Sequence, residues 1–184
     1  MKKTLLVAVM ALLFTTSFAY GQSGTGTTTV SVTVAAEAAL TVNTGTTTLT
    51  TTGFFAPYAG TTNLTYYIRT TQSTGSGSLA LQVTSDFGGA SCTGGPCVAT
   101  PPSAGDALTY TCTVSAPGNN GTATPCTGSV TAKTTAQTNV ATFGADNRSL
   151  VTGNSGSVTW ALTDDPKYKT GTYTATVTFT ISAS

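Results

Sequence analysis

Apolar and polar residues alternate along the last stretch of the chain, residues 171–182. Tyr173, Ala175, Val177, Phe179 and Ile181 fall on one face of an extended backbone, and mostly threonine and serine fill the other. Successive side chains of a β-strand point to opposite faces, so this alternation is typical of a half-buried strand. The pattern predicts a long strand at this end of the chain.

The same alternation recurs through the chain and predicts about ten strands, separated by glycine, proline and asparagine. The other candidates are residues 30–34, 40–42, 46–51, 63–70, 79–83, 108–114, 129–134, 139–143 and 158–162. No helical periodicity follows the first 21 residues. Many short strands at this spacing predict an all-β fold, an immunoglobulin-like antiparallel β-sandwich. We expect a single domain over residues 22–184.

The first residues predict an export signal. Met1, Lys2 and Lys3 form a short basic region, and residues 5–14 (LLVAVMALLF) form an apolar run that is short for a permanent membrane anchor. Small residues favour cleavage before Gln22, with cleavage before Tyr20 as the alternative. We therefore expect a signal peptide over residues 1–21, no membrane anchor after its cleavage, and a secreted protein of the periplasm, cell surface or medium.

Charge is scarce, and this excludes several classes of partner. The chain has 7 Lys and Arg, 6 Asp and Glu, and 7% charged residues, against about 25% in a typical domain. Without Lys2 and Lys3 the formal charge is about −1. No basic patch can release counterions from a phosphate backbone, so we expect no nucleic-acid partner. The same count argues against a basic membrane-surface helix.

All four cysteines lie in a loop-rich region, residues 88–126, which also holds five of the seven prolines. An even cysteine count in an exported chain predicts disulfides. Four cysteines allow three pairings, and we favour Cys92–Cys97 and Cys112–Cys126 because both intervening segments contain turn formers. Zinc is the alternative, but there is no Cys-x-x-Cys spacing and no histidine. A ligand site, if present, is expected first in this loop region. A loop that is closed by disulfides and binds no ligand is the simpler interpretation.

Catalysis has little support in the sequence. A histidine-activated serine or cysteine is impossible because the chain has no histidine. Most carboxylates flank glycine or proline turns, where aspartate caps backbone amides. Asp164 and Asp165 could bind a cation, but a turn is the simpler interpretation. We expect no enzyme activity, no catalytic or metal-binding residues and no cofactor.

Two groups of aromatic residues carry different expectations. Trp160 alternates with Val158 and Leu162, which predicts a place in the core. Phe54, Phe55 and Tyr58 surround Pro57 in an expected loop, and exposed rings of this kind can contact a ligand such as a sugar. These three are therefore candidate ligand-contact residues.

Two segments resemble a known group of proteins. Residues 170–181 (TGTYTATVTFTI) resemble the closing Gly-x-Tyr strand of spore-coat-U-like secreted pilins and related bacterial surface sandwiches. The alternating Val30, Val32 and Val34 resemble the N-terminal extension that such subunits donate to a neighbour. The resemblance implies an immunoglobulin-like fold and a role in a fibre, with these three valines on a donor strand.

The leading functional expectation is a non-catalytic structural or surface protein of the cell envelope, such as a fimbrial subunit that self-associates. The alternative is a soluble binding module or adhesin that recognises carbohydrate or protein through residues 88–126 or Phe54, Phe55 and Tyr58.

Overall fold

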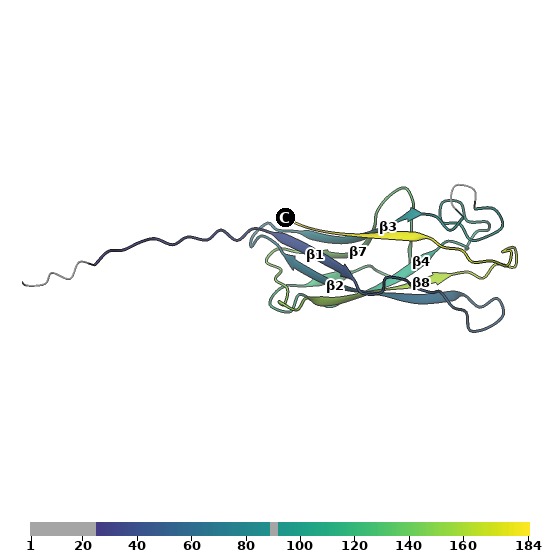
Figure 1. Ribbon diagram of the computed structural model, residues 1–184, viewed down its shortest axis with the longest axis horizontal. Helices are drawn as coiled ribbons and strands as arrows, with labels where there is room; N and C mark the ends of the chain where they lie inside the picture. Colours follow the sequence, from purple (N-terminus) through teal and green to yellow (C-terminus); the bar gives the residue numbers. More distant parts are fainter. Residues whose placement is uncertain (1–24, 89–91) are drawn as a thin grey trace, which may run out of the picture. The chain divides into compact units, whose positions relative to one another are not determined.

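The computed structural model describes residues 25–88 and 92–184, and all regular secondary structure in these residues is β-strand (Figure 1). The expected signal peptide, residues 1–21, lies outside them. The strands are β1 (Glu37–Val42), β2 (Tyr58–Arg69), β3 (Gly77–Ser85), β4 (Thr109–Val114), β5 (Ala123–Pro125), β6 (Val130–Thr131), β7 (Thr138–Phe143), β8 (Asn154–Leu162) and β9 (Thr176–Ala183).

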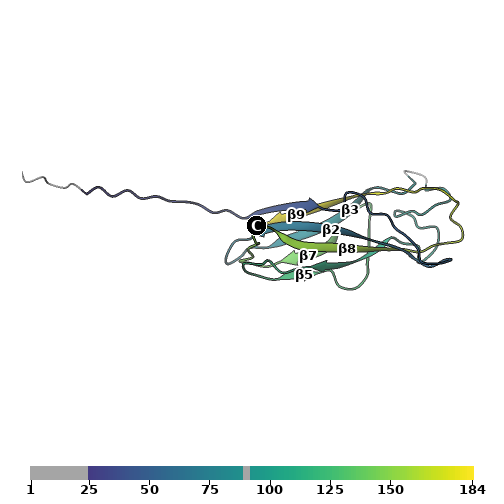
Figure 2. The same cartoon turned by 60° about the horizontal axis from the view of Figure 1, so that its bottom comes forward.

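The strands form two sheets that face each other, as the two views show (Figure 2). One sheet has the order β1-β2-β8-β4-β6 and the other the order β5-β7-β3-β9. Every pairing is antiparallel. The predicted all-β antiparallel sandwich is confirmed. The chain divides into two units after Thr33, and the sandwich belongs to the second, Val34–Ser184.

The core follows from the alternation in the central strands. In β2 the inward residues Leu64, Tyr66 and Ile68 are buried, while the neighbouring threonines and asparagine face outward or lie part-buried. β3, β4, β7 and β8 complete the core, with Leu79, Leu81, Val83, Tyr110, Val114, Val140, Phe143, Val158, Trp160 and Leu162. Burying apolar surface on this scale is the main favourable term in folding.

The polar atoms of the buried aromatic residues Trp160 and Tyr66 form hydrogen bonds. Trp160 is 4% exposed, stacks at a tilt on Tyr110 with ring centroids 5.5 Å apart, and donates from Nε1 to Thr62 Oγ1 at 2.8 Å. The Tyr66 hydroxyl donates to the carbonyl of Ser115, and burial raises the pKa of Tyr66 to about 12. Trp160 is thus in the core, as its alternation predicts.

Residues 46–51 do not form the predicted strand. Thr50 makes an isolated bridge with Ala59, while the backbone of Thr48 crosses over Gly60 so closely that a Cβ there would lie 2.7 Å from the Thr48 carbonyl oxygen. A chain that crosses its neighbour cannot extend a ladder along it. Threonine content alone does not reveal this, because threonine favours extended backbone in either path.

The terminal strand is also shorter than predicted, beginning at Thr176. Tyr173 explains the difference, because its hydroxyl donates to the carbonyls of Gly94 and Lys169 and its ring packs against Gly95. Residues 171–175 are held by loops instead of by β3. The short β5 was not predicted, since it has three residues and ends in Pro125, which is tolerated on a sheet edge.

Replacing Trp160 with alanine should lower the free energy of unfolding by about 3–5 kcal/mol, because a large buried ring is lost and a cavity remains. Equilibrium denaturation followed by circular dichroism measures the loss. Thr159→Ala, on the outward face of the same strand, is the matched control and should lower stability by no more than about 1 kcal/mol, because only an exposed hydroxyl contact with Thr61 and some strand propensity are lost. An unfolding energy for W160A equal to that of the control would show that the ring is not part of the core.

Candidate functional site

β1 and β9 are the outermost strands on one side of the sandwich, one in each sheet. Within the described residues β1 pairs only with β2, and β9 pairs only with β3. The sequence of β9, TVTFTISA, contains no charge and no proline. Natural proteins protect free edges with lysine, proline, bulges or very short strands, because an unprotected edge pairs with another chain. The β9 edge lacks the first two of these devices.

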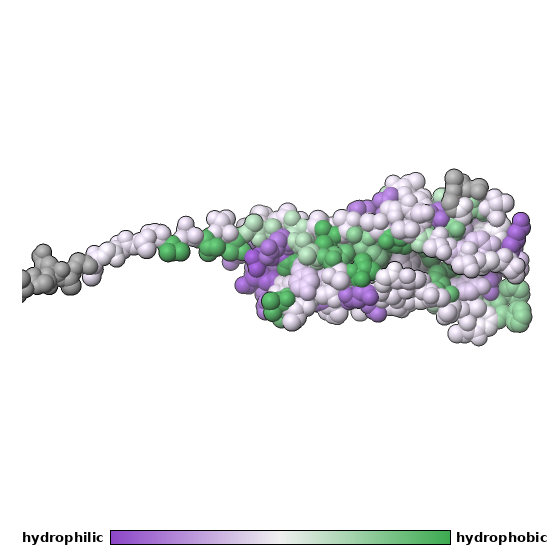
Figure 3. Space-filling model, viewed as in Figure 1, coloured by the Kyte–Doolittle hydropathy of each residue, from purple (hydrophilic) through white to green (hydrophobic). Residues whose placement is uncertain are grey.

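The inward side chains of these two strands are only partly covered. They form an apolar strip, which we define as Ala38, Leu40, Val42, Val177, Phe179 and Ile181. Val42 is 41% exposed and the other five are half-buried, whereas the inward residues of β2 and β8 are nearly all below a tenth. β1 and β9 contact each other, and Figure 3 shows hydrophobic surface gathered on the face where they lie. The core is therefore incompletely covered along this side.

The segment before β1 is extended and carries three exposed valines. Residues 25–36 contain no strand, and Val30, Val32 and Val34 are 90%, 85% and 62% exposed. Isolated exposed apolar residues are common on proteins, but a regular alternation of three is the pattern of a strand that has one apolar face. These are the candidate donor residues.

The four cysteines form the two predicted disulfides, Cys92–Cys97 and Cys112–Cys126, with Cα separations of 5.4 and 5.5 Å. Cys112 lies in β4 of one sheet, and Cys126 directly follows β5 of the other. The second disulfide thus joins the two sheets, and the first closes a loop after β3. Both indicate an oxidising compartment, periplasmic or extracellular.

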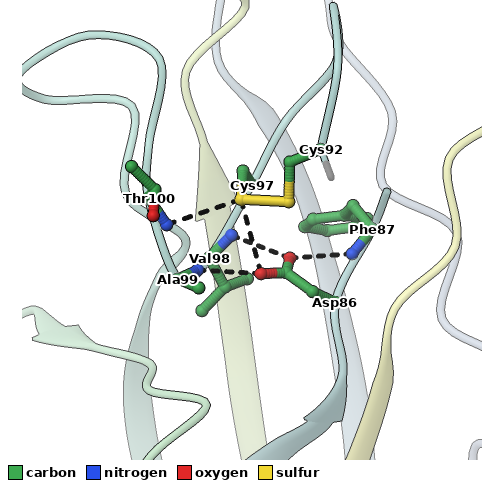
Figure 4. Close-up of a disulfide and its surroundings, with 7 residues drawn as sticks. All are labelled: Asp86, Phe87, Cys92, Cys97, Val98, Ala99 and Thr100. Carbon is green, nitrogen blue, oxygen red and sulfur yellow. Dashed lines mark hydrogen bonds between the residues drawn. A yellow bond between two sulfur atoms is a disulfide. The ribbon is translucent and has the colours of Figure 1, made fainter. Parts of the chain in front are cut away.

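Asp86 organises the loop that holds the first disulfide (Figure 4). Its Oδ1 accepts from the backbone N–H groups of Phe87 and Val98, and its Oδ2 from that of Ala99, each at 2.8 Å. The carboxylate and the sulfurs of Cys92 and Cys97 lie within 4.8 Å of one another, a grouping that can bind a metal ion. Here the sulfurs are bonded to each other and the carboxylate oxygens already accept N–H groups, so the geometry is that of a structural cap.

Two carboxyl groups come together at the same end of the sandwich. Asp165 accepts from the Ser103 hydroxyl at Oδ2 and from the backbone N–H of Lys167 at Oδ1, both at 2.8 Å, and the Lys167 ammonium donates to Ser103 at 2.6 Å. The Lys167 and Ser103 donors hold the pKa of Asp165 below its usual range. Burial, and then the hydrogen bond and charge of Asp165, raise the pKa of Asp106, which is 3% exposed.

These carboxyls divide into one that is ionised and one that retains its proton to higher pH. Asp106 is enclosed, and each Asp165 oxygen already accepts a hydrogen bond, from the Ser103 hydroxyl or from the Lys167 backbone N–H. Beside them is a hollow of about 570 Å³ whose walls include the Cys92–Cys97 disulfide. Its other walls include Thr84, Thr100, Thr134, Lys167 and Tyr168. This hollow belongs to the loop region in which a ligand site was expected.

The candidate ligand-contact aromatics separate in the structure. Phe54 and Phe55 are 98% and 59% exposed, with ring centroids 6.0 Å apart and an interplanar angle of 64°. Tyr58 begins β2 and packs partly against the core, so the three residues do not share one exposed surface. Two rings at this angle offer no common flat platform of the kind on which successive sugar rings stack.

No protein family, curated protein or solved structure matches the chain. Over the described residues, no helix is long and apolar enough to cross a membrane.

The apolar strip is the feature that sequence reasoning missed. Its two strands were predicted, from Leu40 and Val42 and from the terminal alternation. That the strands lie next to each other was not predicted, because they are more than 130 residues apart in the sequence. The contact of Asp106 with Asp165 could not be predicted from their spacing in the sequence either. The disulfide pairing could be predicted, since each disulfide closes a short loop that contains turn-forming residues.

Replacing Asp106 with asparagine should make the protein more stable at neutral pH. A carboxyl whose pKa is raised by folding destabilises the folded state as pH rises above the unfolded value, 3.8, and the amide never ionises. The amide can also still donate to Asp165. Unfolding midpoints of both proteins from pH 3 to pH 8 should coincide near the acid end and separate above about pH 4. A variant less stable than wild type at pH 7 would show that the Asp106 charge itself is needed.

Proposed function

We propose that this protein is a non-catalytic structural subunit of the bacterial cell envelope, secreted and assembled into a fimbria-like fibre by strand donation. The observation that carries the proposal is the apolar strip between two free strand edges, on a chain that also carries an unpaired alternating segment. Residues 28–35 of one copy would lie along the apolar strip of a neighbouring copy.

The segment and the strip complement each other in pattern and chemistry. Val30, Val32 and Val34 share one face of an extended strand, and Thr29, Ser31 and Thr33 share the other. The valines can cover Phe179 and its neighbours, while the backbone of β9 supplies a row of hydrogen-bonding groups. In strand addition of this kind, main-chain bonds provide affinity and the alternate side chains set the register.

A neighbouring copy accepts the segment more readily than its own sandwich does. Val34 is separated from Glu37 at the start of β1 by only Ala35 and Ala36. To fold back, the chain must reverse within these two residues, and tight hairpin turns need the left-handed backbone that glycine and asparagine adopt and alanine avoids. The sequence thus favours donation between molecules.

The compartment and composition support the same function. Two disulfides indicate an oxidising environment. A neutral, threonine-rich surface does little to repel copies of itself, because few like charges oppose their approach. The resemblance of the terminal strand to that of secreted pilins points the same way.

A second candidate function, a binding module or adhesin, is favoured by the hollow beside Lys167. Its threonine hydroxyls, the Tyr168 ring and one ammonium could hold a small acidic sugar or peptide. A glycan array probed with the purified protein tests this function. Specific binding that Lys167→Gln abolishes, without change in assembly, would establish it.

Deleting residues 22–35 should give a folded protein that no longer assembles, because the donated strand is gone while the core strands remain. Circular dichroism measures folding, and sizing chromatography with electron microscopy measures assembly. A synthetic peptide of residues 28–36, added to the deletion variant, should bind it and raise its melting temperature.

The matched control is a peptide of the same composition in which the three valines are adjacent, so that no register places all of them on one face of the strand. It should raise the melting temperature much less. If the deletion unfolds the protein while the intact chain runs as a monomer, the segment belongs to its own core and the proposal fails.

A further inference from the structure

We propose that neighbouring copies also meet end to end, with the Phe54–Phe55 loop of one copy packed against the Leu150–Val151 turn of the next. The partner is a second copy of this chain. This inference rests on the proposed strand donation and adds to it a second contact, between the two ends of the sandwich.

Exposed large apolar side chains in the described residues occur in only three places. Apart from Val42, which belongs to the apolar strip, these places are the N-terminal segment, the pair Phe54 and Phe55, and the pair Leu150 and Val151. Leu150 and Val151 are 41% and 94% exposed. On a surface otherwise covered by threonine, two such pairs mark two candidate contacts.

The two pairs lie at opposite ends of the sandwich. Phe55 shortly precedes Tyr58 at the start of β2, and Val151 shortly precedes Asn154 at the start of β8. These strands are antiparallel, with Tyr58 opposite Leu162 and Tyr66 opposite Asn154. At about 3.3 Å per residue along the strands, the start of β2 at Tyr58 and the start of β8 at Asn154 are roughly 30 Å apart. We call the Phe54 end distal and the Val151 end proximal.

The distal loop is built to expose its rings. The Thr51 hydroxyl donates to the carbonyls of Ala56 and Gly53 at 2.7 and 2.9 Å, and the Ala56 N–H donates to Gly53 at 3.3 Å. Phe55 has a φ of 52°, in the left-handed region that a bulky residue rarely adopts. Local strain of this kind persists where the surrounding structure imposes it, often at a contact surface.

The proximal turn presents a compatible surface. The Gly153 N–H donates to the Leu150 carbonyl at 3.0 Å, and Leu150 packs on Gly118, where a Cβ would lie 2.3 Å from Leu150 Cγ. The nearby charges are already paired, Arg69 with Glu37 at 3.0 Å and Arg148 with Asp146 at 3.4 Å. An apolar contact here therefore leaves no unpaired charge to be desolvated.

The direction of the donated strand relative to β9 places the distal end of the acceptor copy next to the proximal end of the donor copy. β9 runs toward the proximal end, because Ala183 pairs with Gly77 and the Ser184 carbonyl accepts from Thr71. A donated strand antiparallel to β9 therefore runs toward the distal end of the acceptor, and its residue 35 lies there. In the donor, Ala36 alone separates residue 35 from Glu37, which pairs with Arg69 at the donor's proximal end.

If the donated strand ran in the opposite direction, the assembly would be different. A donated strand parallel to β9 would place the two proximal ends face to face, and two copies could then exchange strands in a closed dimer. It would also leave the Phe54 and Phe55 rings of both copies exposed. The antiparallel direction covers both apolar pairs, uses the slightly more stable pairing and leaves an open chain of subunits.

Single-cysteine variants test the arrangement in the full mature chain. The two native disulfides leave the introduced cysteine as the free thiol, so a bismaleimide linker reports on it. Equal amounts of Phe54→Cys and Val151→Cys protein, assembled together, should give a crosslinked dimer. Each variant assembled alone should not, and Thr111→Cys, on the outward face of β4, should not crosslink to Val151→Cys.

Crosslinking of Val151→Cys to itself would indicate the closed dimer and overturn the inference. Assemblies that residues 22–35 are needed to form, but that give no Phe54–Val151 crosslink, would overturn it while leaving strand donation intact. A wild-type chain that stays monomeric would defeat strand donation, and the end-to-end contact would fall with it.

Serine substitutions provide an independent measurement. Phe54→Ser with Phe55→Ser should raise the concentration needed for assembly by about tenfold or more, since burying one phenylalanine contributes a comparable factor. Leu150→Ser with Val151→Ser should do the same. Unchanged assembly combined with lost binding to phosphatidylcholine vesicles would assign the loop to a lipid surface and overturn the inference.

Discussion

The structure depends on the need of a two-layer sandwich to cover both of its long sides. Each sheet ends in a strand whose outer backbone groups have no partner and whose inward side chains have cover from one side only. On one side the short β5 and β6 end the sheets, so little backbone is left open. On the other, six- and eight-residue strands leave a row of hydrogen-bonding groups and the apolar strip. A segment with matching alternation is present on the same chain.

Because the chain has few charged residues, the free edge of β9 has no side chain that would repel a second strand. Lysine or proline on β9 would block pairing, and the chain instead places uncharged Thr176, Thr178 and Thr180 on its outward face. Threonine keeps the strand soluble and extended without repelling a second strand. The few ion pairs are exposed and contribute little to stability, so the fold relies on its apolar core and on the two disulfides.

The two disulfides and the loops around them are held by contacts separate from the apolar core. Cys112–Cys126 ties one sheet to the other, while Cys92–Cys97 and Asp86 fix a loop that contains no strand. The hydrogen bond between Asp106 and Asp165 and the donors around Asp165 add a polar network between residues 103–106 and 165–168.

The sequence by itself predicted most of the strands, the two disulfide pairings and the inward place of Trp160, because alternation and short loops are local properties. It predicted a strand at residues 46–51 that the crossing over Gly60 replaces, and it placed the start of the last strand too early because it could not anticipate the bonds of Tyr173. Only the tertiary structure decided which strands are edges. β1 and β9 become neighbours, Tyr58 separates from Phe54 and Phe55, and Asp106 meets Asp165 through the packing of distant segments. No local spacing encodes these contacts, since each is fixed by how the two sheets close on a shared core.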